Sequence, residues 1–254
     1  MIQEAFAAGN SPVHRMDPRL KIISCVAFSF QVALSMAFLT LISALLAALA
    51  LLAMARLDFV LVMKRLLLIN GFILLFWLVL PVTFPGQSIY SLGPLTVTRE
   101  GVLLSARITL KSNAIMIAFI SLLGTSSLAA IGHAMSSLKV PDKLVHLFLL
   151  TYRYLFVIEQ EYHRLIRAAR VRSFRPGTSL HTYKTYAYLI GMLFVRASAR
   201  AERVYQAMLC RGFKRKFYSL QAFSFTRTDW LWAIFFVSLV FILGVVEWTK
   251  TIPY

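Results

Sequence analysis

The sequence has few of the residues from which enzyme sites and disulfide-rich domains are built. It contains two cysteines, Cys25 in an apolar run and Cys210 in a basic region, so a disulfide between them is not expected. The ten acidic residues are scattered and form no Asp-x-x-Asp pair. No Gly-Lys pair occurs, which excludes a Walker-type phosphate-binding loop. His-Glu-x-x-His and Cys-x-x-Cys patterns are also absent, so neither pattern marks a zinc site.

The histidines do not form a candidate metal site either. Two of the five, His163 and His181, lie in the most basic region, where a metal cation is disfavoured electrostatically. The other three are His14, His133 and His146. We therefore expect no metal and no cofactor in this chain, and we expect any chemistry to be done by partners.

What the chain does contain is apolar residues. Of its 254 residues 59% are hydrophobic, and the mean hydropathy is +0.73. About half of a soluble chain is apolar. The excess indicates a membrane protein.

Long apolar runs predict about five transmembrane helices, each needing about 20 residues. The run Ile22–Ala55 has no charge, glycine or proline and is too long for one span, so it predicts two short spans with a turn near Ser35–Thr40. The other three predicted spans are Leu66–Thr83, Val102–Gly124 and Trp230–Val246, with glycine and proline breaking the chain between the first two.

Positive charge orients the chain. There are 27 Lys and Arg residues against 10 acids, and 13 of the 27 lie between Gln160 and Leu220, with Glu161 and Glu202 as the only acids there. Positive charge gathers on the cytoplasmic side of membranes. We expect this region and the N-terminus in the cytoplasm and the C-terminus outside. Acidic protein surfaces and lipid are the expected anionic partners, and nucleic acid is not.

The predicted fold is an all-α polytopic membrane protein with a basic cytoplasmic domain of two long helices, Asp142–Arg172 and Thr182–Arg211. The predicted parts are an N-terminal cytoplasmic arm (1–21), four transmembrane helices (22–124), the cytoplasmic helices (125–228) and a last transmembrane helix with the C-terminus (229–254).

Two cations interrupt the fourth apolar segment. Arg107 and Lys111 are four positions apart and share one helical face. Charges inside a membrane segment are candidates for function, although snorkelling to the interface would also explain them. They are candidates for an intramembrane contact with another subunit.

One pattern occurs twice in the basic region. Ala168, Arg172 and Ser173 match Ala207, Arg211 and Gly212, and a phenylalanine follows each set. The alanine and arginine are four positions apart, on one face of a helix, and the arginine falls at the helix C-terminus, where a cation is favoured. Contact with anionic lipid would explain the surrounding basic residues. It does not explain the recurrence in register, which favours docking into two similar acidic grooves.

The chain resembles the transmembrane (T) component of energy-coupling factor transporters, and most closely the cobalt-type branch called CbiQ. The paired Ala-x-x-x-Arg-[Gly/Ser] ends, the opening HRMDPRLK (His14–Lys21) and the order of apolar and basic parts carry the resemblance, which covers nearly the whole chain.

The resemblance implies a non-catalytic scaffold in a bacterial or archaeal cell membrane. Two ABC ATPases (CbiO-like) would each receive one arginine, Arg172 or Arg211, with Ala168, Ser173, Ala207 and Gly212 completing the two ends. A substrate-binding membrane subunit (CbiM-like, with or without a CbiN-like small subunit) would hold the cobalt.

Other functions stay open. The substrate subunit of such a transporter could instead serve nickel or a vitamin, since only the HRMDPRLK opening favours the metal branch. A membrane-embedded enzyme acting on lipid or prenyl substrates is disfavoured by the scattered acids, and a stand-alone channel or carrier leaves the basic domain unexplained.

Overall fold

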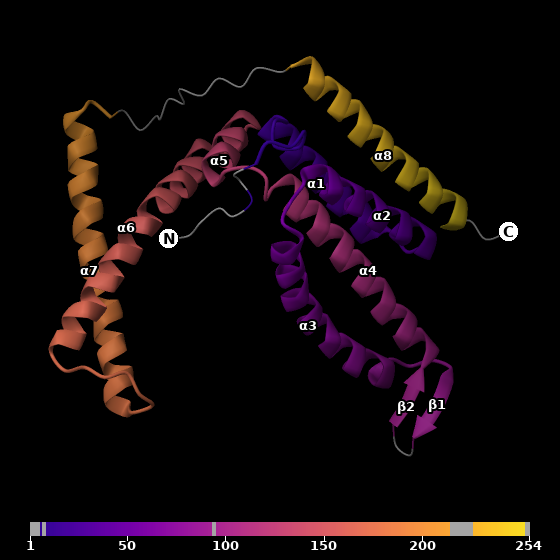
Figure 1. Ribbon diagram of the computed structural model, residues 1–254, viewed down its shortest axis with the longest axis horizontal. Coiled ribbons are helices and arrows are strands. Elements are labelled where there is room, and N and C mark those ends of the chain that lie inside the picture. The colour runs from indigo at the N-terminus through magenta and orange to yellow at the C-terminus, as the bar shows by residue number, and fades with distance from the viewer. Residues whose placement is uncertain (1–5, 7–8, 93–94, 214–225, 252–254) are drawn as a thin grey trace. The chain divides into compact units, whose positions relative to one another are not determined.

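The computed structural model describes residue 6 and residues 9–92, 95–213 and 226–251 (Figure 1). Contacts divide them into two units, one holding residues up to 131 together with 226–251, the other holding 132–213. Along the chain the elements are α1 (Pro18–Leu34), α2 (Phe38–Ala55), α3 (Phe59–Thr83), β1 (Ser88–Leu92), β2 (Leu95–Thr98), α4 (Arg99–Leu122), α5 (Leu128–Ser137), α6 (Asp142–Val171), α7 (Leu180–Cys210) and α8 (Arg227–Thr251).

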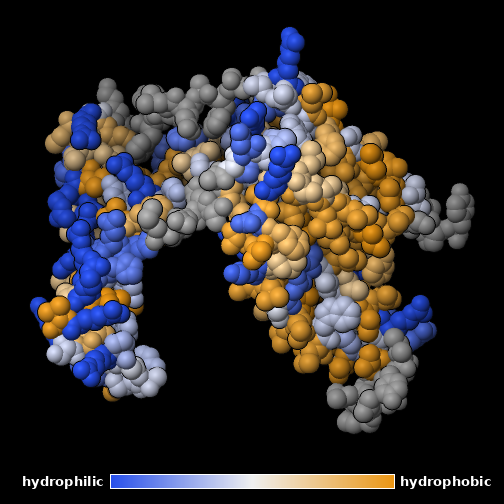
Figure 2. All heavy atoms as spheres, in the orientation of Figure 1, coloured by the Kyte–Doolittle hydropathy of each residue, from blue (hydrophilic) through white to orange (hydrophobic). Residues whose placement is uncertain are grey.

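The first unit is a helical bundle whose centre is built from small side chains. Ala44 and Ala48 of α2 and Ala114 and Ala118 of α4 are fully buried in one cluster with Phe28 of α1. Small residues let helix backbones approach closely, which is how helices pack where lipid removes the hydrophobic driving force between them. The visible surface of this bundle is mostly hydrophobic (Figure 2).

Four helices of the described chain are long and apolar enough to cross a membrane, namely α2, α3, α4 and α8. Together they confirm the polytopic all-α class. With 17 residues α1 is about 25 Å long, somewhat less than the roughly 30 Å of a bilayer's apolar core. It nevertheless packs in the bundle against α4 and α8.

The helices α1 and α8 form a parallel pair that is bonded at both ends. The amide of Asp17 donates to Asp229 Oδ1 (3.0 Å), and the hydroxyl of Ser35 donates to Glu247 Oε2 (2.6 Å). The two bonds are separated by about 27 Å of each helix, at a rise of about 1.5 Å per residue. The pair is therefore fixed in register along its whole length.

Two expectations around α3 were wrong. We expected the third span to begin at Leu66, but α3 begins at Phe59 and includes Lys64 and Arg65, both exposed. Long cationic side chains can extend to the interface from the end of a membrane helix, so charge did not mark its start. The stretch after α3, expected to be a broken loop, contains the antiparallel hairpin β1–β2.

The second unit contains the two long helices that the sequence predicted. The helix α6 follows Pro141 and α7 follows Ser179, whose hydroxyl accepts a hydrogen bond from the amide of Thr182 (3.3 Å). The basic region was expected to extend over 125–228, and the unit's described part is 132–213. In Figure 2 its visible face carries many hydrophilic side chains.

Candidate functional site

The helix α6 ends in a hydrogen-bonded C-terminal motif. The amide of Ser173 donates to Arg170 O (3.0 Å), and the amide of Phe174 donates to Ala169 O (3.1 Å). This is the Schellman pattern, in which the two residues after the cap satisfy the free carbonyls of the last turn. Arg172 is the C-cap residue.

The helix α7 ends in the same way. The amide of Gly212 donates to Leu209 O (2.9 Å), and the amide of Phe213 donates to Met208 O (3.1 Å), with Arg211 as the C-cap residue. Each donor and acceptor at the end of α7 stands at the same position of the repeated motif as its counterpart at the end of α6. The repeated sequence therefore builds one local structure twice.

The residue after each arginine adopts the left-handed conformation. Gly212 has φ of +75° and Ser173 has φ of +61°. Glycine reaches this region without steric cost, whereas a residue with Cβ does not. Serine thus occupies a glycine position in the first end, and the backbone geometry is kept in spite of it.

Both ends present their side chains to solvent. Ala168, Arg172, Ala207 and Arg211 are all exposed. Within the described chain neither Arg172 nor Arg211 takes part in an ion pair or a side-chain hydrogen bond, so the guanidinium groups have donors available for a partner.

The two ends are far apart within their unit. Arg172 precedes α7 by a short loop and Arg211 caps its far end, and 31 helical residues extend about 46 Å. The edge-to-face contact between Phe174 and Tyr186, with centroids 5.7 Å apart, holds the end of α6 against the first turns of α7. One acidic groove cannot receive both arginines, but two separate grooves can.

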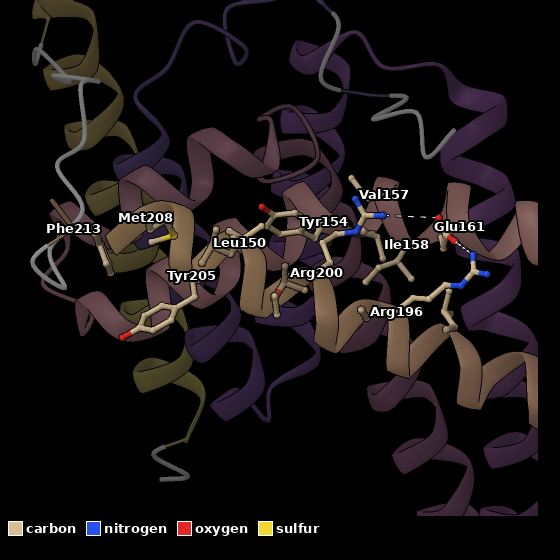
Figure 3. Close-up of a pocket in the computed structure, with 16 residues that line it drawn as sticks. Leu150, Tyr154, Val157, Ile158, Glu161, Arg196, Arg200, Tyr205, Met208 and Phe213 are labelled. Atoms are coloured by element: carbon tan, nitrogen blue, oxygen red, sulfur yellow. Dashed lines mark hydrogen bonds and ion pairs between the residues drawn. The ribbon is translucent and has the colours of Figure 1, made fainter. Parts of the chain in front are cut away.

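Between α6 and α7 lies an apolar groove of about 530 Å³. It is lined mainly by aliphatic and aromatic side chains, including Leu150, Tyr154 and Ile158 of α6 and Tyr205 and Met208 of α7 (Figure 3). Exposed apolar side chains continue beyond it, with Leu147 66% and Phe194 77% exposed. Such a surface is expected to be covered by lipid or by another protein.

A buried carboxylate holds α6 and α7 together beside this groove. Glu161 of α6 is bonded to Arg196 of α7 and lies 3.9 Å from Arg200 and 3.7 Å from Arg164 (Figure 3). The hydrogen bond from Arg196, with the charges of the other two arginines, lowers the pKa of the Glu161 carboxyl below its ordinary value. From the sequence, Glu161 was only one of two acids in the basic region, and no local pattern indicated that it joins the two helices.

The intramembrane cations occupy different environments. The ammonium of Lys111 donates to Ala33 O (2.8 Å) at the end of α1, so it satisfies a carbonyl that the helix leaves free. The guanidinium of Arg107 lies 5.0 Å from the ring centre of Phe38, and its buried Nε has no hydrogen-bond partner among the described residues. The structure brings both to the α1–α2 turn.

Glu247 supplies hydrogen-bond acceptors for the non-helical backbone of that turn. Its carboxylate accepts hydrogen bonds from the amides of Met36 (2.7 Å) and Ala37 (3.3 Å) as well as from the Ser35 hydroxyl. Non-helical backbone inside a bilayer needs such internal partners. Sequence reasoning missed Glu247, because its partners lie near the opposite end of the chain and no local pattern connects them.

Among the described residues no group of three or more His, Cys, Asp and Glu side chains could hold a metal ion.

Comparison with known proteins identifies a family. Residues 9–221 match the model of the CbiQ family, described as cobalt transport protein. A protein of Listeria innocua named energy-coupling factor transporter transmembrane protein EcfT is 27% identical over 99% of this chain and 98% of its own length. Proteins with the same name from Acidaminococcus fermentans (26% identity, 81% of each chain) and Bacillus subtilis (27%, 84% of this chain and 85% of the relative) are also similar.

Proposed function

The chain belongs to the CbiQ family as a transmembrane component of energy-coupling factor transporters, and we propose that it couples two ATPases to a cobalt-binding membrane subunit. The observation that carries the proposal is the pair of structurally equivalent, arginine-capped helix ends, exposed and about 46 Å of helix apart. The chain itself is a non-catalytic subunit.

Each end has the features of a docking surface for one ATPase. Arg172 and Arg211 offer forked donors that suit a carboxylate, and the exposed Ala168 and Ala207 leave room one turn earlier on the same face. Two equivalent ends fit two equivalent copies of a CbiO-like ATPase, because the same local structure requires the same groove. Closure of the ATPase pair on ATP would then move α6 and α7.

The substrate-binding subunit is proposed to cover the apolar surface of α6 and α7. The groove and the exposed side chains around it require an apolar partner, and a CbiM-like membrane subunit, with or without a CbiN-like small subunit, supplies one. Arg107 and Lys111, which both lie at the α1–α2 turn, are proposed as a second contact inside the membrane.

Cobalt is favoured over nickel or a vitamin by the family description and by the HRMDPRLK opening. The curated relatives are named for the transporter class and not for a substrate. We propose the cell membrane as the location, with the N-terminus in the cytoplasm, on the distribution of positive charge.

The test is reversal of charge at both ends. Arg172→Glu combined with Arg211→Glu should abolish co-purification of the ATPase while the chain stays in the membrane, because reversing a charge in a buried interface costs about 2–5 kcal/mol per site. The matched control, Arg167→Glu with Lys184→Glu, makes the same charge change at exposed positions outside the ends. Retention of the ATPase by the first variant would refute the docking proposal.

A further inference from the structure

The segment His14–Lys21 forms a polar cluster that the proposed docking ends do not use. Lys21, in the first turn of α1, is only 1% exposed. Its ammonium donates to the hydroxyls of Thr125 (3.1 Å) and Ser126 (2.7 Å), the third and fourth residues after the end of α4. These residues lie in the part of the chain that leads from the membrane bundle to the unit of α6 and α7, which begins at residue 132.

The same segment is also bonded to the start of α8, the helix that follows that unit in the chain. The Asp229 carboxylate accepts hydrogen bonds from the amide (2.9 Å) and the hydroxyl (2.6 Å) of Thr226, the first residue described after that unit. Its other oxygen accepts the amide of Asp17 (3.0 Å), and the Asp17 carboxylate in turn caps α1 by accepting the amide of Arg19 (2.8 Å).

Apolar side chains just before Asp17 also anchor this part of the chain. Val13 and Met16 are 1% and 3% exposed and lie in one cluster with Leu122 of α4 and Phe236 of α8. A methionine would also fill a site of this kind, whereas an ammonium must be removed from water and hydrogen-bonded there. Packing alone therefore does not explain the choice of lysine.

We propose that His14–Lys21 is the mechanical link between the basic helical unit and the membrane bundle, with Lys21 as its positioning residue. This inference rests on the proposed function, in which α6 and α7 move with the ATPases. The residues that lead from α4 towards the moving unit and the start of α8, which follows that unit in the chain, are both bonded to the start of α1. Because α1 and α8 are joined again at Ser35 and Glu247, the pair transmits displacement across the membrane as one body.

The experiment uses the complete transporter in liposomes with Lys21→Met, and Lys64→Met on the exposed surface of α3 as control. Bound ATPase and ATP hydrolysis should stay within about twofold of the unaltered complex, while uptake of radioactive cobalt per ATP hydrolysed falls at least about tenfold. A merely structural role would lower the amount of complex and leave this ratio unchanged. Equal ratios for the two variants would overturn the link.

A second readout does not depend on the identity of the substrate. A nitroxide label at Leu34→Cys, exposed at the far end of α1, reports on the movement of α1; exposed Cys210 is replaced by serine in this background. ATP with vanadate should change its spectrum in the otherwise unaltered complex and not in Lys21→Met. A change that persists in Lys21→Met would contradict the proposal.

If Lys21→Met does not fold, Lys21→Met with Ser126→Ala removes both sides of the shorter bond and keeps the Thr125 hydroxyl, which still donates to the carbonyls of Ser121 (3.1 Å) and Leu122 (3.0 Å). The same loss of coupling is expected from it, and full coupling would overturn the link. A wild-type chain that binds no ATPase would defeat the proposed function, whereas coupling that survives in these variants defeats the link alone.

Discussion

At the scale of single residues, the two helix ends show how one backbone structure is built from different side chains. Serine and glycine adopt the same left-handed conformation at positions 173 and 212. The sequence predicted the location of both ends, because arginine at a C-terminus followed by a small residue and phenylalanine is a local signal. It could not predict that serine keeps the glycine geometry, since this depends on the hydrogen bonds of the last turn.

Exchanging these two residues tests the cost of that geometry. Ser173→Gly should raise the free energy of unfolding by up to about 1 kcal/mol, because glycine adopts positive φ without strain. Gly212→Ser should lower it by a similar amount. Thermal unfolding of the purified chain measures both, and equal melting temperatures for the two variants would show that neither position is strained.

Glu161 predicts a dependence of stability on pH. Its carboxyl has a lowered pKa in the folded chain, so its contribution is present above the ordinary glutamate pKa of about 4.3 and is lost as pH falls through the lower, folded value. The protection factors of the α6 and α7 amides against hydrogen exchange, taken relative to the intrinsic rate at each pH, should therefore fall on acidification below about pH 4.3. Glu161→Gln should weaken that response, and an identical pH profile in both proteins would contradict this assignment.

At the scale of helices and strands, features that depend on neighbouring residues could be predicted, whereas contacts between residues far apart in the sequence could not. The ends of α6 and α7 follow from capping residues near in sequence. The hydrogen bonds of Lys21 to Thr125 and of Asp17 to Asp229 join residues 104 and 212 positions apart, and no periodicity in the sequence indicates them. The hairpin β1–β2 was missed because its glycine and proline neighbours indicated only a loop.

The packing of α3 on α4 gives a sharp prediction. A Cβ at Gly101 would lie 2.5 Å from Leu80 O and 2.7 Å from Pro81 Cα, and backbone atoms cannot move aside. Gly101→Ala should therefore destabilise the bundle by about 1–3 kcal/mol. Gly71→Ala, with nothing within 4 Å of its Cβ, is the control and should stay within about 1 kcal/mol. Equal thermal stability of the two variants would contradict this packing.

At the scale of the whole molecule, composition separates two kinds of surface. The bundle exposes aliphatic side chains such as Leu67 and Leu68 of α3, at 72% and 80%, as expected for contact with lipid. The basic unit instead combines exposed arginines with an apolar groove, which neither water nor lipid alone satisfies. This combination fits the proposed scaffold between soluble and membrane partners. The positive charge of the unit was visible in the sequence, whereas the apolar groove was not.

The central claim is that this chain holds ATPases and a membrane subunit together. The most direct measurement is purification of the tagged chain from its native membranes in mild detergent, with identification of every co-purifying protein. We predict an ATP-binding cassette protein at two copies per chain and a small membrane subunit whose identity names the substrate. Recovery of the chain intact and alone would contradict the claim.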